Sequence, residues 1–384
     1  MNHQPFIKSL RLRNFLSYGP ESEAIELLPL NVLIGTNASG KSNMLEALSL
    51  LRSLPRNFEK VISEGGGPKE WIWKGDKGKG PAEIELIMNY GEEQSLLSYT
   101  IAFNKVQFQD EQIHITKETL IKNAPEGKAI HCFDRDANGK IKHANSERSL
   151  SQDRPVSSSY GGLTPESAFL ESQFQLIKLY RDWNIGRHMI TRKPQSIELP
   201  GDFLSEDMGN LALILNNLLG GGAEKALLDK LGLFYEGIER IRTKIDRGKV
   251  HISLYEKGLS QPIPATRLSD GMLHYLCLLA LLVHPDPPPL IAIEEPEIGM
   301  HPDAIELIAE LLVEASQHTQ LIVTTHSDLL VSELSDVPES ILVCEHKESG
   351  SEVKRLKKED LDEWLEKYSL GDLWMKGEIG GVRR

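Results

Sequence analysis

The chain has 384 residues and a formal net charge of −13, and its length suffices for a large core and for two lobes. The acidic balance gives no sign of nucleic-acid binding, although local basic surface remains compatible with it. The three cysteines lie far apart and form no CxxC pair, which argues against a zinc hook or a disulfide framework and fits a reducing compartment.

The chain carries no pattern typical of a targeting or membrane segment. Its N-terminus lacks the apolar core of a signal peptide. The most apolar run, residues 276–283, is shorter than the about 20 residues that a membrane span needs. We therefore expect a cytoplasmic protein without a membrane partner.

In the first third of the chain, the sequence predicts one helix with strands before and after it along the chain. Apolar residues recur at helical spacing from Met44 to Leu54, and Pro55 ends that helix. The apolar run 31–34 has no polar alternation, which is typical of a strand buried on both faces. The expected strands lie at residues 6–15, 24–27, 31–34, 84–88 and 97–103.

The rest of the chain predicts helices, a further hairpin, and then strands that alternate with helices. The pattern is helical from Pro165 to about Leu231, with a break at Gly220–Gly222. A hairpin is expected at 240–245 and 250–255, a helix from Ser269, a strand at 290–294, a helix at 303–316 and a strand at 321–325. This order predicts an α/β core that carries a large insertion.

A phosphate-binding pattern lies between the strand 31–34 and the helix that follows it. Residues Gly35 to Ser42, GTNASGKS, match GxxxxGK[ST]. Lys41 can bridge the β- and γ-phosphates of a nucleotide, and the Ser42 hydroxyl can ligate Mg²⁺. The expected nucleotide contacts are Gly35, Asn37, Ala38, Ser39, Gly40, Lys41, Ser42 and Asn43.

Two glutamates follow the apolar strand 290–294 directly. Glu294 is placed to hold the Mg²⁺ shell, and Glu295 is placed to orient or deprotonate an attacking water. The alternative is a solvated acidic cap on a strand. A pair of carboxylates at the mouth of a buried strand is costly unless a cation or water satisfies it.

Two further stretches are compatible with nucleotide chemistry and also with plain structure. Ser269 is a good N-cap for an apolar helix, and Ser269 with the Gly271 N–H can form a second phosphate-binding helix end. The alternative is a capped core helix. His326 follows the strand 321–325, where it can reach a γ-phosphate or be an ordinary loop residue.

The order of these motifs resembles the ABC-type ATPase heads of the SMC, RecF and OLD-like proteins. It is more closely similar to the AAA-21 (AAA_21) group of predicted ATPases. The resemblance rests on RLRNF, GTNASGKSN, LSDGM, IAIEEPEIGMHP and TTHSDLL, and the C-terminal LGDLWMKGEIGG is also similar to that group.

The resemblance implies a P-loop NTPase fold with a mixed central sheet, an antiparallel β-lobe and an inserted helical subdomain. The whole chain would be one ABC-type ATPase domain, with an N-terminal lobe at about 1–160, a helical insertion at about 164–240 and a C-terminal lobe at about 241–384. It also implies a head-to-tail homodimer that sandwiches two ATP molecules, in which Ser269 and Gly271 act in trans and Glu295 and His326 are catalytic.

The chain departs from the family pattern at three points. Asp270 stands where glycine is frequent, and Glu294 replaces the usual aspartate, which adds a methylene to the Mg²⁺ arm. The glutamine expected near Mg²⁺ and the attacking water is ambiguous. Gln173 is the candidate, with Gln175 as a weaker one, and a surface glutamine on a helix is the alternative.

We interpret the sequence as an ATP- and Mg²⁺-dependent switch in DNA maintenance or anti-phage defence, with a separate effector such as a nuclease or toxin. A non-hydrolysing ATP-binding scaffold and a transporter nucleotide-binding subunit are the alternatives. DNA contact would rest on local basic clusters, which are also compatible with ordinary solvated faces. These clusters are Arg187, Arg192 and Lys193, and Arg240, Arg242, Lys244 and Arg247.

Overall fold

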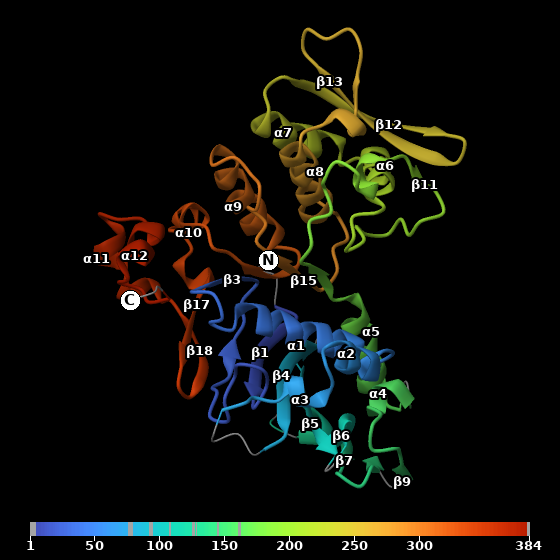
Figure 1. Cartoon of the computed structure of the whole chain (residues 1–384), viewed down its shortest axis with the longest axis vertical. Helices are drawn as coiled ribbons and strands as arrows, with labels where there is room; N and C mark the ends of the chain where they lie inside the picture. Colours follow the sequence, from blue (N-terminus) through green and yellow to red (C-terminus); the bar gives the residue numbers. More distant parts are fainter. Residues whose placement is uncertain are drawn as a thin grey trace. The chain divides into compact units, whose positions relative to one another are not determined.

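The computed structural model describes residues 5–75, 80–91, 95–106, 109–124, 127, 129–143, 146–159 and 163–381. These residues form two compact units. Figure 1 colours the chain from its N-terminus in blue to its C-terminus in red. The first unit comprises residues 1–177, 339–360 and 374–384, and the second comprises residues 178–338 and 361–373.

The first unit is built on an antiparallel sheet. Within the described residues this sheet has eight strands in the order β2-β1-β4-β5-β6-β7-β8-β9. Residues of β4 alternate between buried and half-exposed, and Leu86 lies opposite Tyr99 of β5, so the predicted hairpin is confirmed. The strands are β1 (Ile7–Arg13), β2 (Ile25–Glu26), β4 (Ala82–Tyr90), β5 (Ser95–Val106), β6 (Gln109–Asn123), β7 (Ala129–Arg135), β8 (Lys140–His143) and β9 (Ser146–Ser149).

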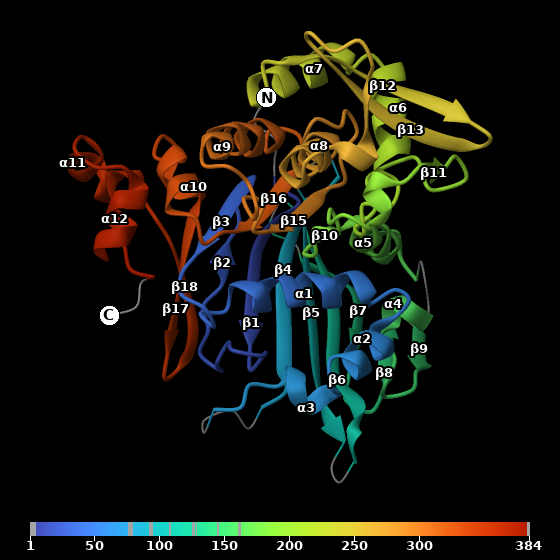
Figure 2. The same cartoon turned by 45° about the horizontal axis from the view of Figure 1, so that its top comes forward.

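A second group of strands in the first unit carries the predicted phosphate-binding loop. Strand β3 (Leu30–Ile34) is buried along its whole length and pairs in parallel with β17 (Ile341–Lys347), which forms a hairpin with β18 (Gly350–Arg355). Helix α1 (Lys41–Ser53) packs on α2 (Phe58–Glu64) and α5 (Pro165–Leu176), as Figure 2 shows. Two short helices, α3 (Pro68–Trp71) and α4 (Val156–Ser159), complete the unit.

The second unit has a parallel sheet with helices beside it. Strands β10 (Lys178–Tyr180), β15 (Leu290–Glu294) and β16 (Gln320–Thr324) pair in that order. Helix α8 (Asp270–Leu282) is apolar on all sides and buried, as such a helix must be. It packs on α6 (Leu211–Gly220), α7 (Glu224–Phe234) and α9 (Asp303–Ala315), and α10 (Asp328–Glu333) packs on α9.

A small antiparallel sheet extends from the second unit. It runs in the order β11 (Gln195–Ser196), β13 (Lys249–Glu256) and β12 (Ile238–Asp246), with β14 (Ile263–Pro264) beside β13. Figure 1 shows β12 and β13 as a long yellow ribbon near α6 and α7. The remaining helical segments are η1 (Ile190–Arg192), η2 (Ala265–Arg267), η3 (Pro338–Ser340), η4 (Lys358–Asp360), α11 (Asp362–Leu365) and α12 (Leu370–Lys376).

One stretch of the sequence was wrongly expected to be helical. Between Lys178 and Asn210 the chain forms β10, a single 3-10 turn, β11 and irregular backbone instead of helix. A three-residue strand such as β10 is too short to show an alternating pattern, so its pairing with β15 decides its conformation. In the part of the chain that the structure describes, no helix combines the length and apolarity needed to cross a membrane.

Candidate functional site

The P-loop joins strand β3 to helix α1 in the first unit, where the sequence predicted it. Gly35 and Gly40 have φ angles of 145° and 107°, and Ala38 between them is left-handed at 64°. A methyl group on Gly35 would lie 2.2 Å from the carbonyl oxygen of Cys344. Glycine is therefore required at the start of the loop, and a loop of this curvature can present successive N–H groups to phosphate.

Lys41, the first residue of α1, lies folded onto this loop. Its Nζ donates hydrogen bonds to the carbonyl oxygens of Gly35 at 2.7 Å and Thr36 at 3.0 Å, and the residue is only 5% exposed. The loop itself thus holds the ammonium group in position. Phosphate oxygens that bind in the loop can accept hydrogen bonds from the same group.

The other predicted P-loop contacts differ in exposure. Asn37, Ala38 and Ser42 are exposed and can be reached by a ligand, whereas Ser39 is buried. The Ser39 hydroxyl has no hydrogen-bond partner among the described residues, so it remains a donor at the loop. Asn43 donates its amide Nδ2 to Ser17 Oγ at 2.7 Å.

Sequence reasoning missed the side chains that support the loop from behind. The Tyr18 hydroxyl donates to the Gly40 carbonyl at 3.0 Å, and Ser351 of β18 contacts Ser17 through their hydroxyls at 2.7 Å. A methyl group on Gly40 would lie 2.5 Å from Ser351 Oγ. Ser17 and Ser351 are 334 positions apart, so no local pattern could have indicated this contact.

The C-terminal segment that resembles the family also packs against the P-loop. A methyl group on Gly381 would lie 3.3 Å from the Cα atom of Gly35. The Gly381 N–H donates to Glu345 at 3.2 Å, and the Trp374 indole donates to the Gly381 carbonyl at 3.3 Å. These contacts explain why glycine and tryptophan are needed there.

In the second unit, Glu294 ends strand β15, as predicted. Its side chain is 24% exposed, and its Oε2 lies 3.6 Å from Nε of Arg181. The indole of Trp183 donates to the Glu294 carbonyl at 3.0 Å. Arg181 and Trp183 follow β10 in the chain. Because the sequence did not predict that strand, it did not predict their contacts with Glu294 either.

The predicted Mg²⁺ ligands offer the donors that this ion prefers. Ser42 supplies a hydroxyl oxygen and Glu294 a carboxylate oxygen, and Mg²⁺ typically takes one or two protein oxygens together with phosphates and water. Glu294 Oε2 lies 3.6 Å from Nε of Arg181, so a bound cation would share this carboxylate with the guanidinium. Gln173 lies half-exposed in α5 and makes no hydrogen bond with the described residues, so its role stays a prediction.

Glu295 and His326 come together in the second unit. Glu295 follows β15 with a left-handed φ of 46°, and its N–H donates to the Thr324 carbonyl of the neighbouring strand at 2.9 Å. His326 follows β16, and its Nε2 lies 3.8 Å from Glu295 Oε1. Strained non-glycine backbone often marks a functional residue, and this geometry turns the carboxylate toward the imidazole.

A third carboxylate, Glu297, binds the backbone of His326 and was not singled out in the sequence. Its Oε1 accepts hydrogen bonds from the Thr325 hydroxyl at 2.5 Å and from the His326 N–H at 3.1 Å. Burial raises the pKa of Glu297, and the nearby Glu295 raises it further. Glu297 Oε2 is buried and takes no hydrogen bond from the described residues, so it is an acceptor available to water.

The predicted second helix end begins at Ser269. The Ser269 hydroxyl oxygen accepts from the Met272 N–H at 3.1 Å, so Ser269 is the N-cap of α8 and its O–H remains able to donate. Ser269 is exposed. A methyl group on Gly271 would meet no described atom closer than the Gly299 carbonyl at 3.9 Å, so the fold does not require glycine there.

One turn further along α8, His274 links this helix to the loop after Glu294. His274 is fully buried, and its Nδ1 lies 3.0 Å from the Ile298 carbonyl oxygen. Its ring lies 4.1 Å from that of Trp183. Burial lowers the pKa of His274 to about 4, so the imidazole is neutral at neutral pH.

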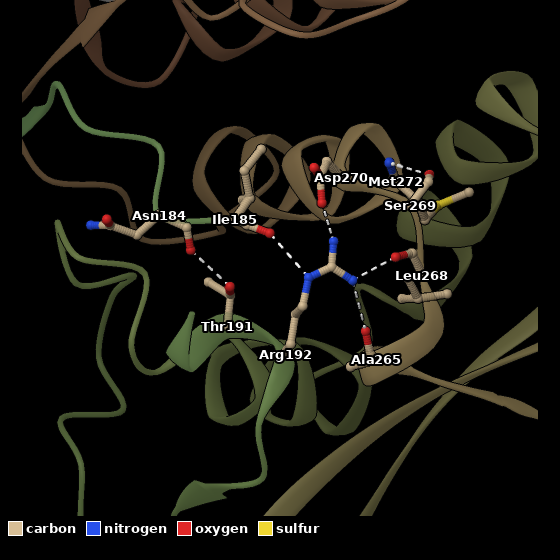
Figure 3. Close-up of polar contacts among 9 residues, drawn as sticks. All are labelled: Asn184, Ile185, Thr191, Arg192, Ala265, Leu268, Ser269, Asp270 and Met272. Carbon is tan, nitrogen blue, oxygen red and sulfur yellow. Dashed lines mark hydrogen bonds and ion pairs between the residues drawn. The ribbon is translucent and has the colours of Figure 1, made fainter. Parts of the chain in front are cut away.

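Arg192 does not lie on a basic surface, contrary to its inclusion in a candidate DNA-binding cluster. It is only 6% exposed and binds the backbone that leads into α8, as Figure 3 shows. Arg187 and Lys193 are exposed, and they remain as the accessible members of that cluster.

A family model described as "AAA domain, putative AbiEii toxin, Type IV TA system", AAA_21, matches residues 30–332, well over half of the chain. The chain belongs to the AAA_21 family. The match extends from β3 through α10, so it includes the P-loop, the start of α8, both glutamates and His326. The predicted similarity to the AAA_21 group is therefore confirmed.

Sequence relatives of this AAA_21 chain include DNA replication and repair proteins named RecF. The protein from Geobacillus sp. (strain WCH70) is 31% identical over 126 residues, which cover 29% of this chain and 33% of that protein. The protein from Exiguobacterium sp. (strain ATCC BAA-1283 / AT1b) is 30% identical over 146 residues, with 32% and 35% covered. The chain thus spans about a third of the length of these relatives.

Solved structures similar to this AAA_21 chain include SMC head domains. A SmcHead crystallised with the C-winged helix domain of ScpA has a TM-score of 0.58 and 16% identity, with 93% of this chain and 99% of that chain covered. The Smc head of Pyrococcus yayanosii has a TM-score of 0.55 and 13% identity, with 94% and 99% covered. The predicted P-loop NTPase head fold is therefore confirmed.

Proposed function

We propose that this AAA_21 chain hydrolyses ATP and is a switch that forms a head-to-tail homodimer when ATP is bound. The proposal rests above all on the juxtaposition of Glu295 and His326, 3.8 Å apart, beside the carboxylate that ends β15. Glu295 orients and deprotonates the attacking water, and His326 donates to the γ-phosphate and thereby responds to its presence.

The P-loop residues bind the triphosphate. Lys41 releases its hydrogen bonds to the loop carbonyls and donates to phosphate oxygens, while Ser42 and Glu294 would hold Mg²⁺. Mg²⁺ held by these residues would supply positive charge to offset that of the phosphates.

The start of α8 supplies the contacts from the second copy. The Ser269 hydroxyl and the Gly271 N–H donate to the γ-phosphate held by the partner's P-loop, where the helix dipole also favours an anion. Because these contacts exist only in the dimer, ATP stabilises the closed state and hydrolysis removes that preference. The contacts are mutual, so the closed assembly has two-fold symmetry.

The proposal is tested by phosphate release at saturating Mg·ATP together with sedimentation of the ATP-bound protein. Glu295→Gln should slow phosphate release by about 100-fold or more and accumulate dimers, because it removes the general base and leaves the phosphate contacts in place. Unchanged release in this variant would remove the mechanism.

A non-hydrolysing scaffold is the second candidate, and one observation favours it. Arg181 lies 3.6 Å from Glu294 and competes with Mg²⁺ for this carboxylate. Wild-type protein that binds ATP and dimerises without releasing phosphate, with and without DNA, would favour this alternative.

We further propose that DNA binds to one face of the β12–β13 hairpin. Cross-strand pairing places Arg240 opposite Tyr255 and Lys244 opposite His251, with Arg242 between them on the same face. The Arg240 guanidinium lies 4.1 Å from the centre of the Tyr255 ring, which holds it against the strand. Such a row of cations fits a phosphate backbone.

A double substitution of Arg242 and Lys244 to glutamine tests this DNA-binding face. DNA affinity should fall and the dependence of affinity on salt should become shallower by about two phosphate contacts. The matched control is Lys354→Gln on β18, which should change neither. An unchanged salt dependence in the double variant would exclude the hairpin as the DNA-binding surface.

We also propose that the switch acts in DNA maintenance or anti-phage defence through a separate effector, such as a nuclease or toxin. The family description names a toxin of a toxin–antitoxin system, and the RecF relatives are named for DNA replication and repair. Co-purification of a neighbouring gene product that depends on ATP and is lost in Lys41→Met would support this proposal.

A further inference from the structure

A buried guanidinium lies beneath the start of α8. Arg192 Nε donates to the Ile185 carbonyl at 3.1 Å, and Nη1 donates to the Leu268 carbonyl at 2.5 Å and the Ala265 carbonyl at 3.4 Å. Figure 3 shows these hydrogen bonds and the guanidinium of Arg192, which faces the first turn of α8. The backbone that leads into Ser269 is thereby held by one side chain.

The fourth contact of Arg192 is an ion pair with Asp270. Nη2 binds Asp270 Oδ1, and the two side chains differ sharply in exposure, at 7% for Arg192 and 65% for Asp270. Asp270 is the first residue of α8 and stands between Ser269 and Gly271. An exposed carboxylate therefore lies within the proposed phosphate-binding helix end.

This carboxylate has two opposite effects on the helix end. A negative charge in the first turn stabilises the helix through its dipole. The same charge would repel an incoming triphosphate, and the repulsion between close charges near a protein surface is substantial. A buried arginine that pairs with Asp270 removes the second effect while it keeps the first turn in place.

We propose that Arg192 is a positioning residue that makes the start of α8 receptive to the triphosphate of the partner copy, by cancelling the charge of Asp270. The inference rests on the proposed ATP-bound dimer. It assigns to Arg192 a role through Asp270, Ser269 and Gly271, and no contact with the nucleotide.

The test measures the ATP concentration that gives half-maximal dimer, with every variant in a Glu295→Gln background so that turnover does not interfere. Arg192→Met should raise this concentration about tenfold or more, because it leaves Asp270 unpaired beside the phosphate. Arg192→Lys keeps the charge and should raise it much less. Lys193→Met, an exposed neighbour with the same loss of charge, should have no effect.

The decisive variant is Arg192→Met combined with Asp270→Asn. If the charge of Asp270 causes the defect, the double variant should recover most of the ATP response, and added salt should reduce the defect of Arg192→Met alone. Binding of a fluorescent ATP analogue to monomers should be equal in all variants, because the P-loop is untouched.

Several results would overturn the inference. A double variant no better than Arg192→Met, or Arg192→Lys as poor as Arg192→Met, would leave Arg192 only a structural role. If thermal unfolding shows that Arg192→Met does not fold, Asp270→Asn provides the test. It should reach half-maximal dimer at or below the ATP concentration of the reference protein. A tenfold rise in that concentration would contradict the charge argument. A reference protein that binds ATP but never dimerises would instead refute the proposed dimer.

Discussion

The two helix starts that would meet ATP, at α1 and α8, are built in different ways. At α1 the loop is shaped by glycines with positive φ, and a buried lysine supplies the positive charge. At α8 the first turn is capped by a serine and carries an exposed aspartate whose partner, Arg192, lies beneath it. The first brings its own cation to the proposed phosphate site, whereas the second offers the Ser269 hydroxyl and the Gly271 N–H as donors.

From this difference we expect the start of α1 to bind the nucleotide before the start of α8 does. A loop with its own cation can bind a triphosphate alone. A helix end that offers one hydroxyl and one N–H without a cation of its own would add too little to hold a nucleotide alone, but it could respond to one already bound by the partner copy. We therefore propose that the first unit binds the triphosphate and that the second unit senses it.

The largest effect is expected for Lys41→Met, which tests whether the P-loop cation holds the triphosphate. The substitution keeps the length of the side chain and removes the charge, so ATP affinity should fall about 10- to 100-fold, as expected for a lost charge-assisted contact to phosphate. Titration of monomers with a fluorescent ATP analogue measures it. Near-normal affinity would mean that the P-loop cation is not what holds the triphosphate.

Gly271→Val tests the sensing end. A Cβ at this position comes no closer than 3.9 Å to a described atom, the Gly299 carbonyl oxygen, so the unfolding temperature should change little. The ATP concentration for half-maximal dimer should rise about tenfold, because the side chain obstructs the phosphate. Light scattering against ATP concentration measures this rise.

Gly35→Ala is the matched glycine variant in the binding end. It places a methyl group 2.2 Å from the Cys344 carbonyl at a positive φ, so it should destabilise the protein by about 1–3 kcal/mol even without ATP. If Gly271→Val destabilises the monomer as much as Gly35→Ala, the two helix starts do not differ as described.

The smallest effect is expected for Glu297→Gln, which tests whether Glu297 holds His326 in place. Glu297→Gln replaces a charged acceptor with a neutral one for the Thr325 hydroxyl and the His326 N–H, so His326 is held less firmly. Phosphate release should slow about fivefold, while ATP affinity stays the same. Glu306→Gln on the exposed face of α9 is the control and should match wild type, and equal rates in both variants would show that Glu297 does not support the site.

Much of the site could be predicted because its signals are local in sequence. The GxxxxGK[ST] pattern, the serine cap of α8 and the glutamates at the end of β15 each depend on residues that are neighbours in the chain. The structure confirms these elements where the sequence placed them. The alternation in β4 and β5 likewise follows directly from burial of one face of the sheet.

The rest could not be predicted because it depends on tertiary contacts. Arg192 looked like a surface cation, and only the fold brings it beneath Asp270, 78 positions away. Glu297 lies in a stretch already rich in carboxylates, and nothing local separates it from them before β16 brings Thr325 and His326 to it. Strand β10 exists because β15 offers it a parallel edge.

We propose that each ATP is held by the P-loop of one copy and by the α8 start of the other. Mixing two variants, each defective at one of these ends, tests this arrangement. At an ATP concentration near the wild-type half-maximal value, Lys41→Met and Gly271→Val should each release phosphate much more slowly than wild type. An equimolar mixture should recover about a quarter of the wild-type rate, because half of the dimers then hold one intact site of two. A mixture that releases phosphate no faster than the average of its two components would contradict the claim.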